Sequence, residues 1–176
     1  MSPEPKSAPG HVPFGRATAG ATPKQRVLFR LMRERVHLIG AYQGLSAAQL
    51  VEPMAEGAGS VRDALALVAA WEVAAVDALP AARAGVRPAM MGFSYEDEER
   101  WRAEQLAHSR ALALEDVMRG LQLTRLELLD QLEVMPEEPA AMWEPTEAVG
   151  WLVDRLARND REQADAIKRW RAEKEY

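Results

Sequence analysis

Residues 151–170, WLVDRLARNDREQADAIKRW, decide how the fold is interpreted. The apolar members of one helical face in this stretch are Leu152, Leu156, Ile167 and Trp170. Their spacing is typical of an amphipathic helix that packs on a core. The two positions that complete the face hold amides, Asn159 and Gln163, one helical turn apart. We therefore expect both amides to point into the core, and the question of function begins with them.

Composition indicates an all-α globular protein. The chain has 176 residues, of which 48% are hydrophobic and 28% are charged. Ala, Leu, Glu and Arg dominate and β-branched residues are few, which favours helices. The formal net charge is -5, and basic residues alternate with acidic ones. Without a basic stripe carrying aromatic residues, nucleic acid is not expected as a partner.

The residue types that are missing exclude several kinds of chemistry. There is no cysteine, so disulfides, thiolate nucleophiles and thiolate metal sites are excluded. The first residues have no apolar segment of a secretory signal, and no apolar run is judged long enough to span a bilayer. These observations predict a cytoplasmic protein with no membrane partner.

The chain divides into a tail and one domain. Residues 1–21 are rich in Pro, Gly, Ala and Ser and are predicted to be a flexible tail, with His11 and Phe14 as its unusual members. Residues 22–176 are predicted to form a four-helix bundle. The long helices are expected at about 23–43, 60–80 and 113–134, and a fourth that begins at a cap at Thr146 and contains residues 151–170. A long connection between the second and third, with a short helix at 94–109, predicts a crossover.

Local signals set the helix ends and the inward faces. Thr22, Ser46 and Ser60 are predicted N-caps, and Pro80 is expected to end the second long helix. The first long helix is expected to turn a basic face outward. Its core side is predicted to hold Leu28, Leu31, Met32, Val36, Ile39 and Tyr42.

Three motifs suggest a family. They are GLSAAQL at 44–50, SVRDALALVAAWE at 60–72 and NDREQADAIKRW at 159–170. Together they resemble the DinB/YfiT-like four-helix bundles, closest to the ClbS/DfsB branch. The resemblance implies a bundle with a crossover, frequently a homodimer. Many such proteins hold a divalent metal with one histidine on the second helix and two on the fourth. Activities in the superfamily include thiol-dependent transfer and isomerisation, and in the ClbS branch a resistance hydrolase.

The metal ligands of that family are replaced in this chain. Leu67 stands where the resemblance places the histidine of the second helix, and Asn159 and Gln163 stand where it places the pair of the fourth. Leucine cannot bind a metal, and neutral amides are poor ligands for zinc or nickel. The three histidines of the chain, His11, His37 and His108, share no ligand spacing. We therefore expect neither a metal nor another cofactor.

Two interpretations of the amide pair remain open. In the first, Asn159 and Gln163 are vestiges of a ligand pair, bonded to each other or to a buried water. In the second, they line a small-molecule pocket between the second and fourth helices, with Leu67 and Trp71 as an apolar wall. Arg155, one turn before Asn159, can bind an anionic ligand or pair with Glu72, although a surface arginine is the simpler interpretation.

Few residues are candidates for catalysis or for covering a site, and three hypotheses about function follow. Glu72 is the one candidate general base, although a solvated carboxylate is the simpler interpretation. Tyr95 and Trp101 are candidates for a lid over the bundle. The first hypothesis is a metal-free bundle that binds a small molecule. The second is a metal-independent hydrolase or transferase of the ClbS type acting on a reactive small molecule. The third is a dimeric interaction protein with a vestigial site.

Overall fold

The computed structural model describes residues 20–55 and 59–176, and this part of the chain is mostly helical. The helices in chain order are α1 Pro23–Tyr42, α2 Ala47–Val51, α3 Val61–Arg83, η2 Ala89–Gly92, α4 Tyr95–Ser109, α5 Leu114–Glu133, η3 Ala140–Trp143 and α6 Ala148–Lys174. Within these residues there is no β-strand, only an isolated bridge between Pro53 and Ser60. The all-α prediction is confirmed. The predicted tail, with His11 and Phe14, falls almost wholly outside the described residues.

The predicted N-caps form as reciprocal capping boxes. The side chains of Thr22, Ser46 and Ser60 each accept a hydrogen bond from the third backbone N–H of the helix that follows. In each helix the third side chain returns a bond to the cap, so two otherwise unpaired N–H groups are satisfied. Ser94 caps α4 in the same way. Local sequence therefore determines where these four helices begin.

Two helix ends differ from the prediction. α3 continues through Pro80 and ends at Arg83. Proline lacks the backbone N–H that would bond the carbonyl four residues earlier, so α3 loses that one hydrogen bond and continues for one more turn. α6 begins after Glu147 rather than Thr146, and no side-chain hydrogen bond caps it.

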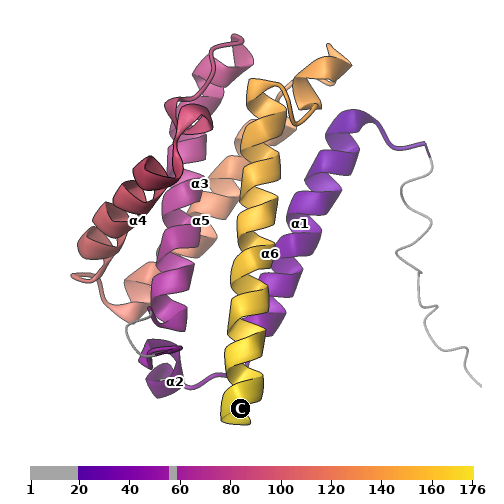
Figure 1. Ribbon diagram of the computed structural model, residues 1–176. Helices are drawn as coiled ribbons and strands as arrows, with labels where there is room; N and C mark the ends of the chain where they lie inside the picture. The colour runs from indigo at the N-terminus through magenta and orange to yellow at the C-terminus, as the bar shows by residue number, and fades with distance from the viewer. Residues whose placement is uncertain (1–19, 56–58) are drawn as a thin grey trace, which may run out of the picture.

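The four long helices pack side by side (Figure 1). α1 lies along α6, and α3 lies between α6 and α5. α1 and α6 run in the same direction, opposite to α3 and α5, so the chain must return between α3 and α5. α4 is this return segment, and it packs on the outer side of α3. It has little contact with α5, which leaves space over α3 between the two helices.

The predicted inward face of α1 is correct for Leu31, Leu28 and Tyr42, which are buried or packed against the core, and wrong for the other three residues. The side chains of α1 that are buried are those of Leu31, Glu34, Arg35, Leu38 and Ala41. Met32, Val36 and Ile39, predicted to be inside, are exposed by 44%, 68% and 41%. The prediction assumed that the buried face of α1 is apolar, whereas two charged residues, Glu34 and Arg35, are buried there, each paired with other residues. The core-facing stripe is thereby rotated around the helix axis.

α3 is the most apolar of the described helices, and it corrects the expectation that no apolar run is long enough to span a bilayer. Its 23 residues have a mean hydropathy of 1.6 over the most apolar window, which is enough by length and composition to cross a membrane. However, 56% of that window is buried against the other helices. A buried central helix has the same composition as a membrane span, so the criterion is weak evidence for one.

Candidate functional site

Four of the five predicted ligand-binding residues are packed in the core. Leu67 and Trp71 of α3 are 5% and 3% exposed, and Arg155 and Asn159 of α6 are 9% and 3% exposed. Gln163 is only half-buried, so the prediction that both amides point into the core holds for Asn159 alone. No hydrogen bond joins the two amides in the described part of the chain, where the Asn159 amide nitrogen also has no partner.

Arg155 is not the surface arginine of the simpler interpretation. Its guanidinium lies 4.4 Å from the centre of the Trp71 ring and forms an ion pair with Glu98 of α4. The Trp71 ring in turn lies 4.5 Å from that of Trp101, measured between ring centres. Arg155 therefore joins α6 to α4 across two tryptophans, and its partner is not Glu72. A desolvated contact between a cation and an aromatic ring contributes about 2 kcal/mol.

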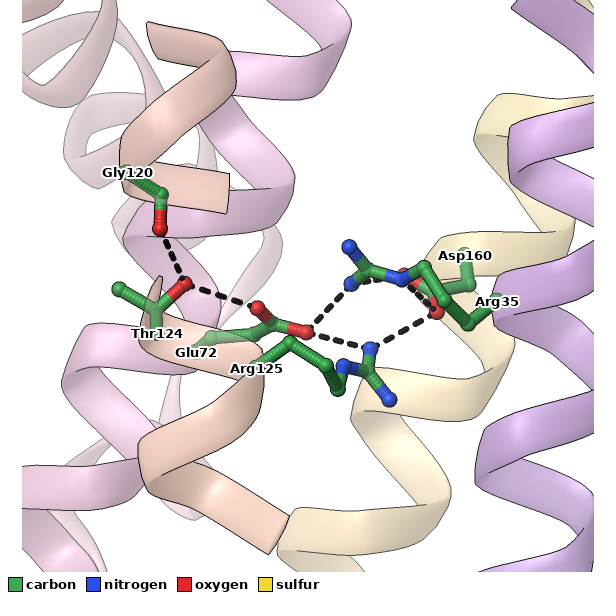
Figure 2. Close-up of polar contacts among 6 residues, drawn as sticks. All are labelled: Arg35, Glu72, Gly120, Thr124, Arg125 and Asp160. Atoms are coloured by element: carbon green, nitrogen blue, oxygen red, sulfur yellow. Dashed lines mark hydrogen bonds and ion pairs between the residues drawn. The ribbon is translucent and has the colours of Figure 1, made fainter. Parts of the chain in front are cut away.

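Glu72 is also not solvated. Its side chain is 0% exposed, and one carboxylate oxygen forms ion pairs with both Arg35 of α1 and Arg125 of α5. Asp160 of α6 closes the group as the second acid (Figure 2). We call Arg35, Glu72, Arg125 and Asp160 the charge quartet. It joins all four long helices through two positive and two negative side chains.

The geometry of the quartet is that of strong ion pairs. Arg35 binds Asp160 with two nitrogens, Nε to Oδ2 at 3.0 Å and Nη2 to Oδ1 at 3.1 Å. Arg125 Nη2 donates to Asp160 Oδ2 at 2.9 Å. Such charge-assisted, partly bidentate contacts are stronger than hydrogen bonds between neutral groups. The quartet therefore fixes the position of α1 and α5 relative to α6 and α3.

Thr124 completes the polar contacts of Glu72. Its Oγ1 lies 2.9 Å from Glu72 Oε2 and 2.9 Å from the carbonyl of Gly120 (Figure 2). The hydroxyl has one proton, so it donates to one of the two at a time. Both oxygens of Glu72 thus face protein donors, which leaves this carboxylate no direct access to a substrate.

Burial shifts the proton affinities within the quartet. It raises the pKa of the Glu72 carboxyl, an effect that the charges of Arg125 and Arg35 oppose. It also lowers the pKa of the Arg125 guanidinium, against the effect of Glu72. Both changes come from moving a charge away from water. With all four groups ionised the quartet carries no net charge, which lowers the cost of burying its charges.

Sequence reasoning missed Arg35, Arg125 and Asp160, although a signal was present. Each occupies a position at which helical periodicity predicts an apolar core residue. Arg35 lies between Leu31 and Leu38, Arg125 between Leu121 and Leu128, and Asp160 between Leu156 and Ala164. Two basic and two acidic residues at inward positions of four different helices are consistent with a neutral buried group.

An open hollow lies elsewhere, between α3, α4 and α5. It is an open groove of about 480 Å³, which we call the α4 groove. Its lining is Ala66, Ala69, Ala70, Val73, Ala74, Asp77, Trp101, Gln105, His108, Ser109, Leu112, Asp116, Val117, Gly120 and Thr124. A second hollow, of about 40 Å³, lies between α1, η3 and α6. None of the five predicted residues lines either one.

The remaining candidate residues lie apart from one another. Trp101 lines the α4 groove, whereas Tyr95 is 80% exposed and contributes nothing to covering it. His37 and His108 are exposed on different helices, and His11 lies outside the described residues. Among residues 20–55 and 59–176, no three side chains of His, Cys, Asp or Glu gather as metal ligands do.

Comparison of the chain with family models, curated proteins and solved structures finds no match. The DinB/YfiT-like relationship therefore stays a prediction, as do the homodimer and the cytoplasmic location. Two features of the structure remain as a basis for a proposed function: the buried charge quartet and the open α4 groove.

Proposed function

We propose that this protein is a metal-free, DinB/YfiT-like four-helix bundle that binds a small molecule in the α4 groove. In this proposal α1, α3, α5 and α6 are the four bundle helices and α4 is the crossover. The parallel course of α3 and α5 supports it, since a chain that joins two parallel neighbours must return along the outside (Figure 1). The proposed ligand position moves from the α3–α6 contact to the α4 groove, because the former is filled by side chains.

The observation that carries the proposal is the size and lining of the groove. Ligand pockets usually enclose about 300–1,000 Å³ and are mostly apolar with a few placed polar groups. The α4 groove holds about 480 Å³. Small side chains at every helical turn of α3, those of Ala66, Ala70 and Ala74, form its floor. Larger residues at these positions would close the groove between α4 and α5.

The charges of the groove indicate the ligand class. Trp101 gives an aromatic wall, and Asp77 and Asp116 place two exposed carboxylates at the lining. Asp116 has Arg119 at 3.3 Å, whereas Asp77 has no ion-pair partner among the described residues. A flat apolar molecule with an amino group fits this combination, since the ring can pack on Trp101 while the ammonium faces a carboxylate.

The experiment compares three matched probes by isothermal titration calorimetry: 1-naphthylmethylamine, 1-naphthalenemethanol and 1-naphthoic acid. We expect the amine to bind best and the acid worst. Ala70→Phe should abolish binding by filling the floor, whereas Ala81→Phe, on an exposed part of α3 outside the groove, should leave it unchanged. Equal binding to both variants would place the ligand elsewhere and refute the groove. Equal affinity for amine and acid would refute the role of the carboxylates.

A further inference from the structure

Thr124 of α5 connects the α4 groove to the charge quartet. Its side chain lines the groove and is half-buried, and its Oγ1 lies 2.9 Å from Oε2 of Glu72 (Figure 2). The other oxygen of Glu72, Oε1, forms both ion pairs, one with Arg35 and one with Arg125. Among the described residues, Thr124 is the one polar partner of Oε2. The buried carboxylate therefore meets the groove through a single hydroxyl group.

The proton of the Thr124 hydroxyl is directed at Glu72. Two acceptors compete for it, the Glu72 carboxylate and the Gly120 carbonyl, each at 2.9 Å. A hydrogen bond to an ionised acceptor is roughly twice as strong as one between neutral groups, so the carboxylate is favoured. With its proton on Glu72, the hydroxyl offers the groove only the lone pairs of its oxygen. Toward a ligand, Thr124 is thus an acceptor and not a donor.

The groove is open beside this hydroxyl. Gly120 lies one helical turn before Thr124 and also lines the groove. A Cβ at Gly120 would meet no atom within 4 Å, so no side chain fills the space there. The two carboxylates of the lining, Asp77 and Asp116, are exposed, whereas Thr124 is half-buried. A hydrogen bond is stronger where water is partly excluded, which makes Thr124 the best shielded acceptor of the three.

We propose that Thr124 determines the specificity of the α4 groove, by accepting a hydrogen bond from an ammonium N–H of the ligand while it donates to Glu72. The inference rests on the proposed function and narrows the ligand class, because it requires an ammonium group that keeps at least one N–H. Glu72 is a positioning residue in this arrangement. Its charge fixes the direction of the Thr124 hydroxyl without touching the ligand.

The hydrogen bond and the charge attraction can be measured separately. Asp77 and Asp116 attract any cation, and this attraction does not depend on an N–H group. A quaternary ammonium keeps the charge but has no hydrogen to donate. Comparing a primary with a quaternary ammonium therefore isolates the contribution of Thr124.

The test is isothermal titration calorimetry of the native chain with 1-naphthylmethylamine and with its N,N,N-trimethyl derivative. We expect the amine to bind about tenfold more tightly, the effect of one hydrogen bond to a charged group. Equal affinities, or tighter binding of the trimethyl derivative, overturn the role of Thr124. The groove itself still stands in that case if Ala70→Phe abolishes the binding of both probes. Binding of neither probe to the native chain overturns this inference and the proposed function together.

Substitution of Thr124 separates the hydrogen bond from the larger size of the trimethyl group. Thr124→Val keeps the shape of the side chain and should abolish the advantage of the amine, whereas Thr124→Ser keeps the hydroxyl and should retain it. The matched control Thr146→Val, at an exposed threonine outside the groove, should leave the affinity ratio unchanged. An advantage of the amine that survives in Thr124→Val overturns the inference. If Thr124→Val loses its helical circular dichroism, the comparison of the two probes on the native chain and on Thr124→Ser carries the test.

Discussion

Replacing Glu72 by Gln tests whether the charge quartet holds the fold together. The substitution keeps the shape of the side chain but removes one of two negative charges that balance Arg35 and Arg125. Glu72 is 0% exposed, so water cannot take its place. Removing one member of a buried ion pair costs about 3–5 kcal/mol, because the remaining charge stays buried and uncompensated.

The assay is urea denaturation followed by circular dichroism. With a denaturant slope of roughly 2 kcal/mol/M, the Glu72→Gln midpoint should fall by about 1.5–2.5 M. Glu104→Gln, at an exposed residue of α4 without an ion-pair partner in the described chain, should change the free energy of unfolding by less than about 0.5 kcal/mol. The control separates the loss of a buried charge from the general effect of an amide.

The double variant Glu72→Gln/Arg125→Met supplies the decisive comparison. It leaves Arg35 and Asp160 as a neutral pair with two nitrogen–oxygen contacts. We expect it to be more stable than the sum of the single changes by at least about 1 kcal/mol. It also removes the Nε and Nη1 groups of Arg125, which have no hydrogen-bond partner in the described residues. Two results would refute the claim that charge balance stabilises the fold. One is that the changes in the free energy of unfolding of the two single variants simply add up in the double variant. The other is that Glu72→Gln lowers the free energy of unfolding by less than about 1 kcal/mol.

Three further predictions concern a close contact, acid and metal. Gly150→Ala should lower the free energy of unfolding by more than about 2 kcal/mol in the same urea assay, because a Cβ there overlaps the carbonyl of Glu144. Gly40→Ala, where a Cβ meets open space, should raise the free energy of unfolding by about 0.5–1 kcal/mol. Burial acts to raise the pKa of Glu34, but hydrogen bonds from two arginines hold it below its ordinary value of 4.5. The contribution of ionised Glu34 to the free energy of unfolding is therefore present above pH 4.5 and is lost as the pH falls through the lowered pKa. Glu34→Gln should therefore unfold with a lower free energy than the native chain at neutral pH, and the two values should converge in acid. A difference in the free energy of unfolding that does not change with pH would contradict this. Elemental analysis of the purified protein should find no stoichiometric zinc or nickel, and finding either would contradict the metal-free proposal.

Sequence alone determined the helical elements and where most of them begin. The capping boxes at Thr22, Ser46 and Ser60 are local, since each cap and its partner lie three residues apart. Composition and periodicity were sufficient for the all-α class. The inward position of Asn159 could also be predicted, because its neighbours on α6 repeat with the helical period.

Only the tertiary structure decided which charged residues are buried and where the molecule is hollow. A single helix cannot show whether Arg35 is inside, because the acids that make its burial favourable come from α3 and α6, 37 and 125 residues away. The α4 groove likewise depends on how far α4 lies from α5, which no local pattern contains. Interactions between residues a few positions apart can be predicted from the sequence of one helix. Charge balance and cavities cannot, because they depend on how several helices pack together.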